Sequence, residues 1–332
     1  MERQVILLWD LIDVFREELG HVLDAVDSPG PGRPPVYPAE GMFLLWLLMY
    51  LGIADSQRRL IQLLTQHREL RRKLGFNGGI PDQTSFSWFK NHRAKHVFKQ
   101  VFDETVHKLI EAGVIRGDHL VVDASLFHAY SNPRKKDKES GKTSDADATW
   151  AKETRTGQWL YGYKLHVASC VDSELPLTLT VTTGKQGDSP LFPQLLQEAS
   201  KFPIVIRIVG ADGNYHSAMN HLEAYKIGAC TVIPLPQRSH KKPETLAEKL
   251  RLHPLIKRGT KLYQQLKNKR QSVERVFSRL KSHFNLDNLK VRGLVKVKQH
   301  VLLSVTSMLV YALTAAKRGY VNLVRSPTRL TV

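Results

Sequence analysis

The chain has 332 residues, enough for one large domain or two ordinary ones, and a hydrophobic content of 42% indicates a globular protein with a sizeable core. Its 49 Lys and Arg residues outnumber its 31 Asp and Glu residues, which gives a formal net charge of +18. Such an excess is far from the near-neutral balance of most soluble domains and predicts an extended polyanion as the partner.

The positive charge is concentrated in the second half of the chain. Between Gln237 and Lys298 there are 18 Lys or Arg residues and four acids, whereas the first 30 residues carry seven acids and two arginines. The amino terminus is therefore not a basic DNA-binding arm, and nucleic acid is expected to meet the carboxyl-terminal half first.

Several features indicate a cytoplasmic protein without a membrane partner. The start of the chain lacks the basic segment and cleavage site of a secretory signal. Two apolar runs, residues 42–54 and 300–316, fall short of the roughly 20 residues that span a membrane and are expected to be buried helices. Cys170 and Cys230 have apolar surroundings and no CxxC spacing, which predicts reduced, buried thiols.

The first third of the chain is predicted to be helical, with a Pro- and Gly-rich linker at residues 28–38. The stretch FNGGIPDQTSFSWF predicts a turn and a helix start, with Pro81 and Thr84 or Ser85 as capping candidates. This pattern fits a DNA-binding helix-turn-helix and, equally well, two packed core helices. Helices are expected over residues 39–50, 55–74 and 93–115.

Two acids end buried strands in the second domain. The apolar runs HLVVDAS and IVIRIVGAD end in Asp123 and Asp212, and both predict strands. The polar residues 127–158 predict a long mobile loop with Trp150 and Trp159 toward its end. The other expected elements are a hairpin over residues 160–184, a helix from Gly187 to Lys201, a helix from Ser217 to Ile227, a strand over residues 229–236 and a basic, mostly helical segment over residues 237–269.

Asp188 precedes Pro190 at the start of one of these helices. Asp188 or Ser189 is interpreted as the N-cap, because Pro is favoured in the first helical turn. A catalytic role for Asp188 is the alternative.

The helix over residues 263–284 has an apolar stripe with a helical period and a charged line on another face. On the charged line, one acid, Glu274, lies between Arg270 and Lys281. A solvated face with weak ion pairs is the simplest interpretation of such a line. The apolar stripe consists of Val273, Val276, Phe277, Leu280 and Phe284.

Adjacent strands would bring Asp123 and Asp212 to one edge of the sheet, and the helix packed on that sheet would bring Glu274 there. Three clustered carboxylates repel one another unless a cation joins them. All-oxygen ligands suit Mg²⁺ or Mn²⁺, and two such ions can catalyse cleavage of a phosphodiester. Cations beside Glu274 can then hold DNA phosphates.

The spacing of Arg270, Glu274 and Lys281 resembles the signature helix of bacterial insertion-sequence transposases of the DDE type, in the subgroup with a Y-R-E-K signature. VVDAS, YGYKLH, GDS, GADGNYHS and RQSVERVFSRLK occur in that family's order, over residues 118 to about 316. The front stretch EGMFLLWLLMYLGIADSQRRL resembles the family's front domain. The resemblance implies an α/β fold class: an RNase H-like catalytic domain with a mixed five-stranded sheet flanked by helices, preceded by an all-α domain.

The resemblance implies that Asp123, Asp212 and Glu274 are the catalytic metal ligands, with two Mg²⁺ or Mn²⁺ ions as cofactor. It implies double-stranded DNA as partner, both element ends and target, bound by a homodimer without a nucleotide cofactor. Asp188 and Tyr215 are possible auxiliary residues. The residues expected to contact DNA are Arg270, Lys281, Lys267, Arg279, Lys241, Lys242, Lys257, Arg258, Trp150 and Trp159, with Lys249, Arg251 and Lys261 in the same basic run.

The chain departs from the subgroup at two positions. Lys267 stands where a tyrosine usually precedes the arginine, the nearest tyrosine being Tyr263, and Asn214 stands where a small residue or lysine is usual. The predicted domains are a helical one over residues 1–115, a catalytic one over residues 116–320 and a tail. A catalytically silent DNA-binding protein of the same fold is the main alternative function, and a general RNase H-like nuclease is a third.

Overall fold

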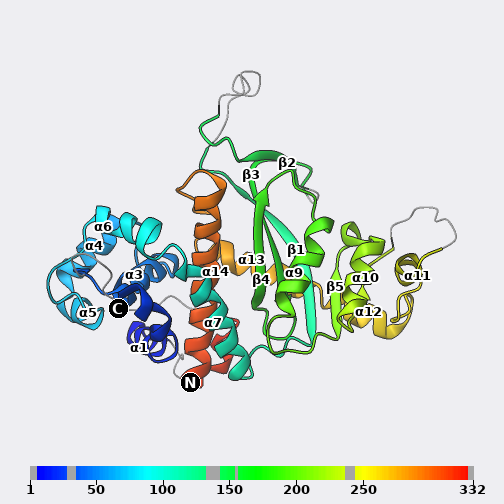
Figure 1. Cartoon of the computed structure of the whole chain (residues 1–332), viewed down its shortest axis with the longest axis horizontal. Coiled ribbons are helices and arrows are strands. Elements are labelled where there is room, and N and C mark those ends of the chain that lie inside the picture. Colours follow the sequence, from blue (N-terminus) through cyan, green and yellow to red (C-terminus); the bar gives the residue numbers. More distant parts are fainter. Residues whose placement is uncertain (1–5, 28–34, 132–142, 154–155, 236–243, 328–332) are drawn as a thin grey trace. The chain divides into compact units, whose positions relative to one another are not determined.

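A computed structural model describes residues 6–27, 35–131, 143–153, 156–235 and 244–327. The chain forms two compact units (Figure 1). The first, here called the helical unit, comprises Met1–Val114, Arg279–Leu286 and Leu302–Val332. The second, the sheet unit, comprises Ile115–Ser278 and Asp287–Val301. The helical unit thus includes two segments that follow the region of the strands in the chain.

A mixed sheet forms the centre of the sheet unit, with the strand order β2-β3-β1-β5-β6. Strand β1 pairs antiparallel with β3 and parallel with β5, which is parallel with β6. Strand β3 pairs first with β2 and then, further along, with β4, both antiparallel. The strands are β1 His119–His128, β2 Thr149–Lys152, β3 Trp159–Cys170, β4 Pro176–Thr183, β5 Ile208–Ala211 and β6 Cys230–Val232.

Helices follow the strands of this sheet. In Figure 1, α9 passes in front of the strands and α13 passes behind them. The helices are α9 Phe192–Ala199, α10 Ala218–Lys226, α11 Leu246–Leu252, α12 Lys261–Asn268 and α13 Gln271–His283, with short 3-10 turns at Ser189–Leu191 and Gly213–Tyr215. The predicted fold class, α/β with a mixed sheet flanked by helices and preceded by helices, is confirmed. In the described part of the chain the sheet has six strands where five were predicted, because β2 forms within the predicted loop.

The single helix predicted over residues 263–284 is divided into α12 and α13, and its apolar stripe is buried. Each of its five members is at most 7% exposed, whereas Glu274 on the same helix is exposed. The periodicity of the sequence therefore located both the buried face and the solvated face of this helix.

The helical unit contains one short helix whose start differs from the prediction. Asp82 is the N-cap of α6 and accepts a hydrogen bond from the Ser85 N–H at 2.6 Å, so Pro81, Thr84 and Ser85 do not cap it. The helices before the sheet are α1 Leu8–Leu19, α2 Asp24–Asp27, α3 Ala39–Tyr50, α4 Gln57–Gln66, α5 Arg68–Lys73, α6 Gln83–Trp88 and α7 Val97–Glu111, with a 3-10 turn at Gly20–Leu23 and a π-helical turn at Phe89–Arg93.

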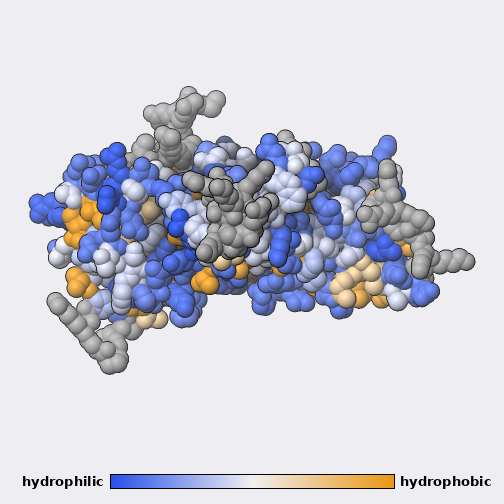
Figure 2. All heavy atoms as spheres, turned by 90° about the horizontal axis from the view of Figure 1, so that it is seen from above, coloured by the Kyte–Doolittle hydropathy of each residue, from blue (hydrophilic) through white to orange (hydrophobic). Residues whose placement is uncertain are grey.

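Helix α14, Leu294–Lys317, is long and apolar enough to cross a membrane by length and composition. However, 83% of its apolar window is buried within the protein, as in the core helix of a globular protein. Helix α3 is likewise almost wholly buried, so both apolar runs form the buried helices that were expected. Figure 2 shows a face that is mainly hydrophilic, with small separate hydrophobic patches.

The predicted loop over residues 127–158 is partly regular structure, which corrects that prediction. Strand β1 extends to His128, and β2 lies inside the range and pairs with the start of β3. Residues 132–142 and 154–155 of this range lie outside the described residues. Both cysteines are free: Cys170 is buried as expected, and Cys230 is half-buried.

Candidate active site

The two acids that were expected at strand ends are neighbours across the sheet. Strands β1 and β5 are parallel, and Val122 pairs with Ala211 at the end of their register. Asp123 and Asp212 are the next residues after this pair, so they lie side by side where the β1–β5 pairing ends. Asp212 directly follows β5, as predicted, whereas β1 continues past Asp123 to His128, which corrects the predicted strand end at Asp123.

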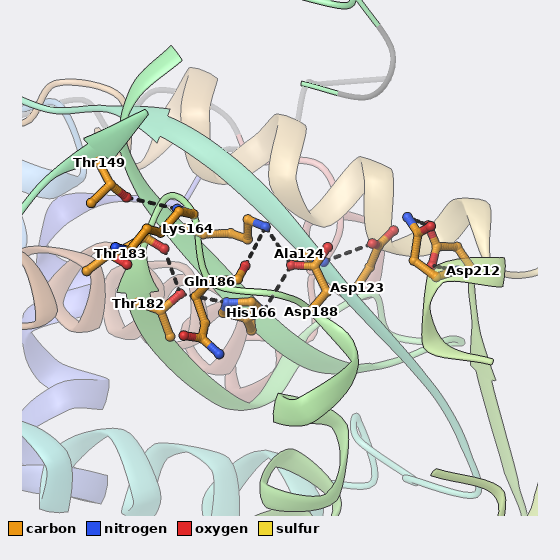
Figure 3. Close-up of polar contacts among 12 residues, drawn as sticks. Asp123, Ala124, Thr149, Lys164, His166, Thr182, Thr183, Gln186, Asp188 and Asp212 are labelled. Atoms are coloured by element: carbon orange, nitrogen blue, oxygen red, sulfur yellow. Dashed lines mark hydrogen bonds and ion pairs between the residues drawn. The ribbon is translucent and has the colours of Figure 1, made fainter. Parts of the chain in front are cut away.

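Local hydrogen bonds hold both carboxylates. Asp123 Oδ1 accepts from the Ala124 N–H at 2.8 Å, a contact drawn in Figure 3. Asp212 caps the turn that follows β5: its Oδ1 accepts from the Asn214 N–H at 2.9 Å and its Oδ2 from the Asn214 amide at 3.1 Å. Asn214, a departure from the resembled family, therefore orients Asp212.

Burial makes these two carboxyl groups hard to ionise. Burial raises the pKa of Asp123 to about 7, and the Asp212 charge adds to this, whereas the Ala124 N–H and Arg270 oppose it. Burial also raises the pKa of Asp212, against the Asn214 N–H and Arg270. Raised carboxyl pKa values in one cluster are typical of functional sites and mark a place that favours added positive charge.

Arg270 links the strand acids to the acid on α13. Its Nη1 donates to Asp123 Oδ2 at 2.9 Å and its Nη2 to Glu274 Oε1 at 3.2 Å. The Glu274 side chain is 57% exposed, against 17% for Asp123. Arg270 was expected to contact DNA, and here its guanidinium supplies the positive charge between two of the predicted metal ligands.

The donor set fits a hard divalent cation, although its members do not converge on one point. Among the described residues, no three His, Cys, Asp or Glu side chains are grouped closely enough to hold a metal ion. Carboxylate oxygens are nevertheless the ligands that Mg²⁺ and Mn²⁺ prefer. The raised pKa values of Asp123 and Asp212 agree with a site that binds a cation.

Asp188 is at the N-cap position of the turn Ser189–Leu191, as the preferred interpretation has it, but its side chain makes no capping hydrogen bond. Its carboxylate accepts a hydrogen bond from Lys164 Nζ at 2.7 Å and lies 3.8 Å from His166 Nδ1 (Figure 3). Its charge also raises the pKa of Asp123 and of Asp212, after larger effects from burial. Asp188 therefore belongs to the electrostatic surroundings of the two strand acids.

Tyr215, the other auxiliary candidate, is fully buried beneath the turn that follows Asp212. Burial raises the pKa of Tyr215 far above its usual range, and Asp123, Asp188 and Asp212 raise it further. Its hydroxyl has no hydrogen-bond partner within the described part of the chain. The phenol is therefore a neutral group that shares the surroundings of the acids.

The predicted DNA-contacting cations fall into several groups. Lys257 and Lys267 are exposed, and Lys281, two turns beyond Glu274 on α13, is half-buried. Arg279 is 8% exposed and donates to the Arg325 carbonyl, and Arg258 donates to three backbone carbonyls, so both hold the protein's own backbone and leave the DNA-contacting set. The positions that lie outside the described residues are Lys241 and Lys242.

The two tryptophans differ in their surroundings. Trp150 lies on β2, half-buried, with its ring centroid 5.4 Å from that of Tyr161. Trp159 begins β3 and is 64% exposed. The predicted stacking on a base therefore has an open surface only at Trp159.

Sequence reasoning gave no role to Lys164 and Glu174. The signal for Lys164 was a cation inside YGYKLH, an otherwise buried strand, where a charge requires a partner. Glu174 lies in the β3–β4 turn and pairs with Arg275, the neighbour of Glu274, whose Nε donates to Glu174 Oε1 at 2.7 Å. Nothing in the sequence pattern joins residues so far apart in the chain.

Two family models match the chain. The model described as "Transposase DDE domain" matches residues 116–310, and the model described as "Transposase domain (DUF772)" matches residues 3–92. Neither model addresses the Y-R-E-K subgroup, which stays a prediction.

Several solved structures are similar to the chain. The piggyBac transposase synaptic complex with hairpin DNA is 12% identical, with a TM-score of 0.41, over 94% of this chain and 75% of that one. The Drosophila P element transposase strand transfer complex is 11% identical, with a TM-score of 0.30, over 93% of this chain and 65% of that one. The Mos1 transposase paired-end complex with the left transposon end is 13% identical, with a TM-score of 0.22, over 86% of this chain and 82% of that one.

Proposed function

Because the chain belongs to the transposases with a DDE domain, enzymes that cleave DNA and transfer strands, we propose that Asp123, Asp212 and Glu274 are its catalytic acids. The observation that carries this proposal is the β1–β5 register, which makes Asp123 and Asp212 neighbours where the pairing of these strands ends. The contacts of Arg270 with Asp123 and Glu274 support the place of Glu274 in the same cluster.

The family depends on divalent cations, and we propose that the three carboxylates hold two Mg²⁺ or Mn²⁺ ions. When bound, such ions activate the attacking oxygen and stabilise the leaving oxygen. Asp123 and Asp212 are held by local N–H groups, so their orientation is set before a cation arrives.

The residues of this chain would bind and orient the DNA at this cluster. Water is the nucleophile in the cleavage step and a 3′ hydroxyl is the nucleophile in strand transfer, both as in-line displacements at phosphorus without a covalent protein intermediate. Arg270 would move from the acids to a phosphate when the acids gain another counter-charge, because its guanidinium can pair with either anion. In the structure it supplies a positive charge beside Asp123.

We propose double-stranded DNA as the partner, with the terminal inverted repeats of the element as the specific site. The exposed Lys257 and Lys267 and the half-buried Lys281 would contact the backbone, and the exposed Trp159 would stack on an unpaired base. A homodimer would hold two element ends in one complex, in the cytoplasm near the nucleoid.

The experiment is nicking of supercoiled plasmid with Mg²⁺ or Mn²⁺, together with a gel shift. Wild-type protein should nick and bind, whereas Asp123→Asn and Glu274→Gln should bind DNA without nicking. Glu198→Gln, which removes an exposed acid of α9 paired with Lys201, is the matched control and should nick as wild type does.

Two outcomes would oppose the proposal. Nicking retained by Asp123→Asn would remove the acid from the chemistry. Binding without nicking by wild-type protein, even on a plasmid that carries the element's own ends, would favour a catalytically silent DNA-binding protein.

A further inference from the structure

Asp188 is held firmly from strand β3. Lys164 Nζ donates to Asp188 Oδ1 at 2.7 Å and to the Gln186 carbonyl at 2.9 Å, so one ammonium group fixes both the carboxylate and the backbone before it (Figure 3). His166 lies two residues further along β3, and because alternate residues of a strand point to the same face, both side chains reach the same segment. Its fully buried ring places Nδ1 3.8 Å from Asp188 Oδ1.

Helix α10 holds the same segment from another element. The amide of Asn220, a buried side chain, donates to Ser189 Oγ at 2.9 Å and to the Tyr215 carbonyl at 2.8 Å. The residue after Asp188 is thereby tied to the turn that follows Asp212. Since contacts from both sides fix the segment, Asp188 keeps its place without a helix cap.

The ion pair between Lys164 and Asp188 is more buried than an ordinary surface ion pair. The side chains of Lys164 and Asp188 are 14% and 24% exposed, so the pair is largely removed from water. His166 Nδ1 and the Tyr215 hydroxyl, both buried, have no hydrogen-bond partner among the described residues. Polar groups without partners and a desolvated acid are costly for stability, and they are retained at sites where charge is used.

The charges around the strand acids do not balance. Four carboxylates, those of Asp123, Asp188, Asp212 and Glu274, are accompanied by the cations Lys164 and Arg270. The acids therefore outnumber the cations in these contacts, and this imbalance favours an added cation. Asp188 is also close to the strand acids: Asn220 joins the residue after it to the Tyr215 carbonyl, three residues beyond Asp212, and Figure 3 draws the three acids together.

We propose that Asp188 is a positioning residue of this site, which strengthens divalent-cation binding at Asp123 and Asp212 through its charge, while Lys164 fixes its place and limits its effect. The inference rests on the proposed function, because it requires a cation site at the strand acids. It makes opposite predictions for the two partners of one ion pair: removal of Asp188 weakens cation binding, and removal of Lys164 strengthens it. A purely structural ion pair would make both removals act alike.

The test is direct binding of Mn²⁺ to the metal-free full chain, without DNA, followed by the loss of the free Mn²⁺ signal in electron paramagnetic resonance. Asp188→Asn should weaken binding about tenfold, the lower end of the range for residues that support metal ligands. Lys164→Met should strengthen it by several fold, because the charge of Asp188 is then uncompensated. The double variant Lys164→Met/Asp188→Asn should resemble Asp188→Asn.

Two further variants separate the possible failures. Asp123→Asn should abolish binding, and the surface variant Glu198→Gln should bind as wild type does, since its acid is exposed and pairs with Lys201, two residues beyond α9. Thermal unfolding of each variant shows whether it is folded, and the double variant tests the charge effect without leaving either partner unpaired.

Three results would overturn the proposal. Asp188→Asn that binds within twofold of wild type would remove the charge effect, with the proposed function intact if Asp123→Asn still abolishes binding. Equal weakening by Asp188→Asn and Lys164→Met would assign the pair a structural role. Equal binding by wild type and Asp123→Asn would show that the cation site itself is wrong, and both proposals would fail together.

Discussion

The acids carried by the sheet differ from the acid carried by the helix. Asp123 is 17% exposed, and burial raises the pKa of both Asp123 and Asp212, whereas the Glu274 side chain is 57% exposed. Backbone N–H groups fix the two strand acids, and Glu274 reaches them through Arg270 alone among the contacts described. Asp123 and Asp212 are therefore fixed in orientation and poorly hydrated, whereas Glu274 is well hydrated.

This difference predicts that the strand acids lower stability in the absence of a cation. Placing a carboxylate in a poorly hydrated position costs free energy, which a counter-charge or hydrogen bonds to the carboxylate recover in part. Glu274 is hydrated and should carry no such cost. Variants of equal effect on catalysis should thus have different effects on unfolding.

Asp123→Asn should give the largest effect. In the metal-free protein at pH 8 it should raise the free energy of unfolding by up to about 4 kcal/mol, because the shift of the Asp123 pKa from 3.8 to about 7 corresponds to roughly that amount. Urea unfolding measures the change. Glu274→Gln is the matched comparison and should remain close to wild type, so equal shifts for both variants would contradict the difference between strand and helix acids.

The free energy of unfolding of the wild-type protein should also depend on pH, with a change about half as large as that expected for Asp123→Asn. The unfolded chain releases the Asp123 proton near pH 3.8 and the folded protein near pH 7, so between these values the folded state binds more protons and stability falls as pH rises. Between pH 5 and pH 7 the contribution is about 2 kcal/mol. Urea unfolding at several pH values should show this slope for wild type and Glu274→Gln, and a smaller slope for Asp123→Asn.

Arg270→Gln should sharpen the comparison by removing the group that joins the two kinds of acid. Loss of the guanidinium should raise the Asp123 pKa further and lower stability at pH 8 by about 1.5–3 kcal/mol, the usual range for a hydrogen bond to a charged group. Urea unfolding at several pH values measures the effect. The free energy of unfolding stops falling above the pKa of folded Asp123, and in Arg270→Gln this limit should move to higher pH. Lys267→Gln, at an exposed position three residues earlier, should leave it unchanged.

Glu174→Gln should have the smallest effect on stability. It should change the contact of the β3–β4 turn with α13 and leave Asp123 and Asp212 unaffected. It weakens the contact with Arg275, so it should lower the free energy of unfolding by about 1 kcal/mol, because the arginine that remains is exposed and well hydrated. Its stability should keep the wild-type dependence on pH. A flattened pH dependence in this variant would mean that the turn, and not burial of Asp123, sets the behaviour of the strand acids.

The sequence was sufficient for the periodic and sequential parts of this architecture. Apolar runs that end in acids located Asp123 and Asp212, and the helical period located Val273 and Glu274 on different faces of α13. Short-range patterns of this kind are set by the geometry of a single strand or helix. The position of the candidate acids follows from them once the strands are adjacent.

Contacts between distant elements could not be predicted in this way. Asp188 resembled an N-cap because Pro190 follows it, yet Lys164 on β3 takes its carboxylate. Arg258 and Arg279 looked like DNA contacts, yet backbone carbonyls of the folded chain accept their hydrogen bonds. In each case a partner supplied by the folded structure decides the role of a charge whose local sequence is uninformative.

The division of the helical unit among separated segments has a consequence for folding during synthesis. Asp10 pairs with Arg318 and Glu18 with Lys317, and the Asn285 amide donates to the Met49 carbonyl. Ribosomes release the chain from its amino terminus, and domains usually fold as they emerge. The early helices must wait for partners that are translated after every strand of the sheet, so a nascent chain can complete its sheet while its first helices still lack their final contacts.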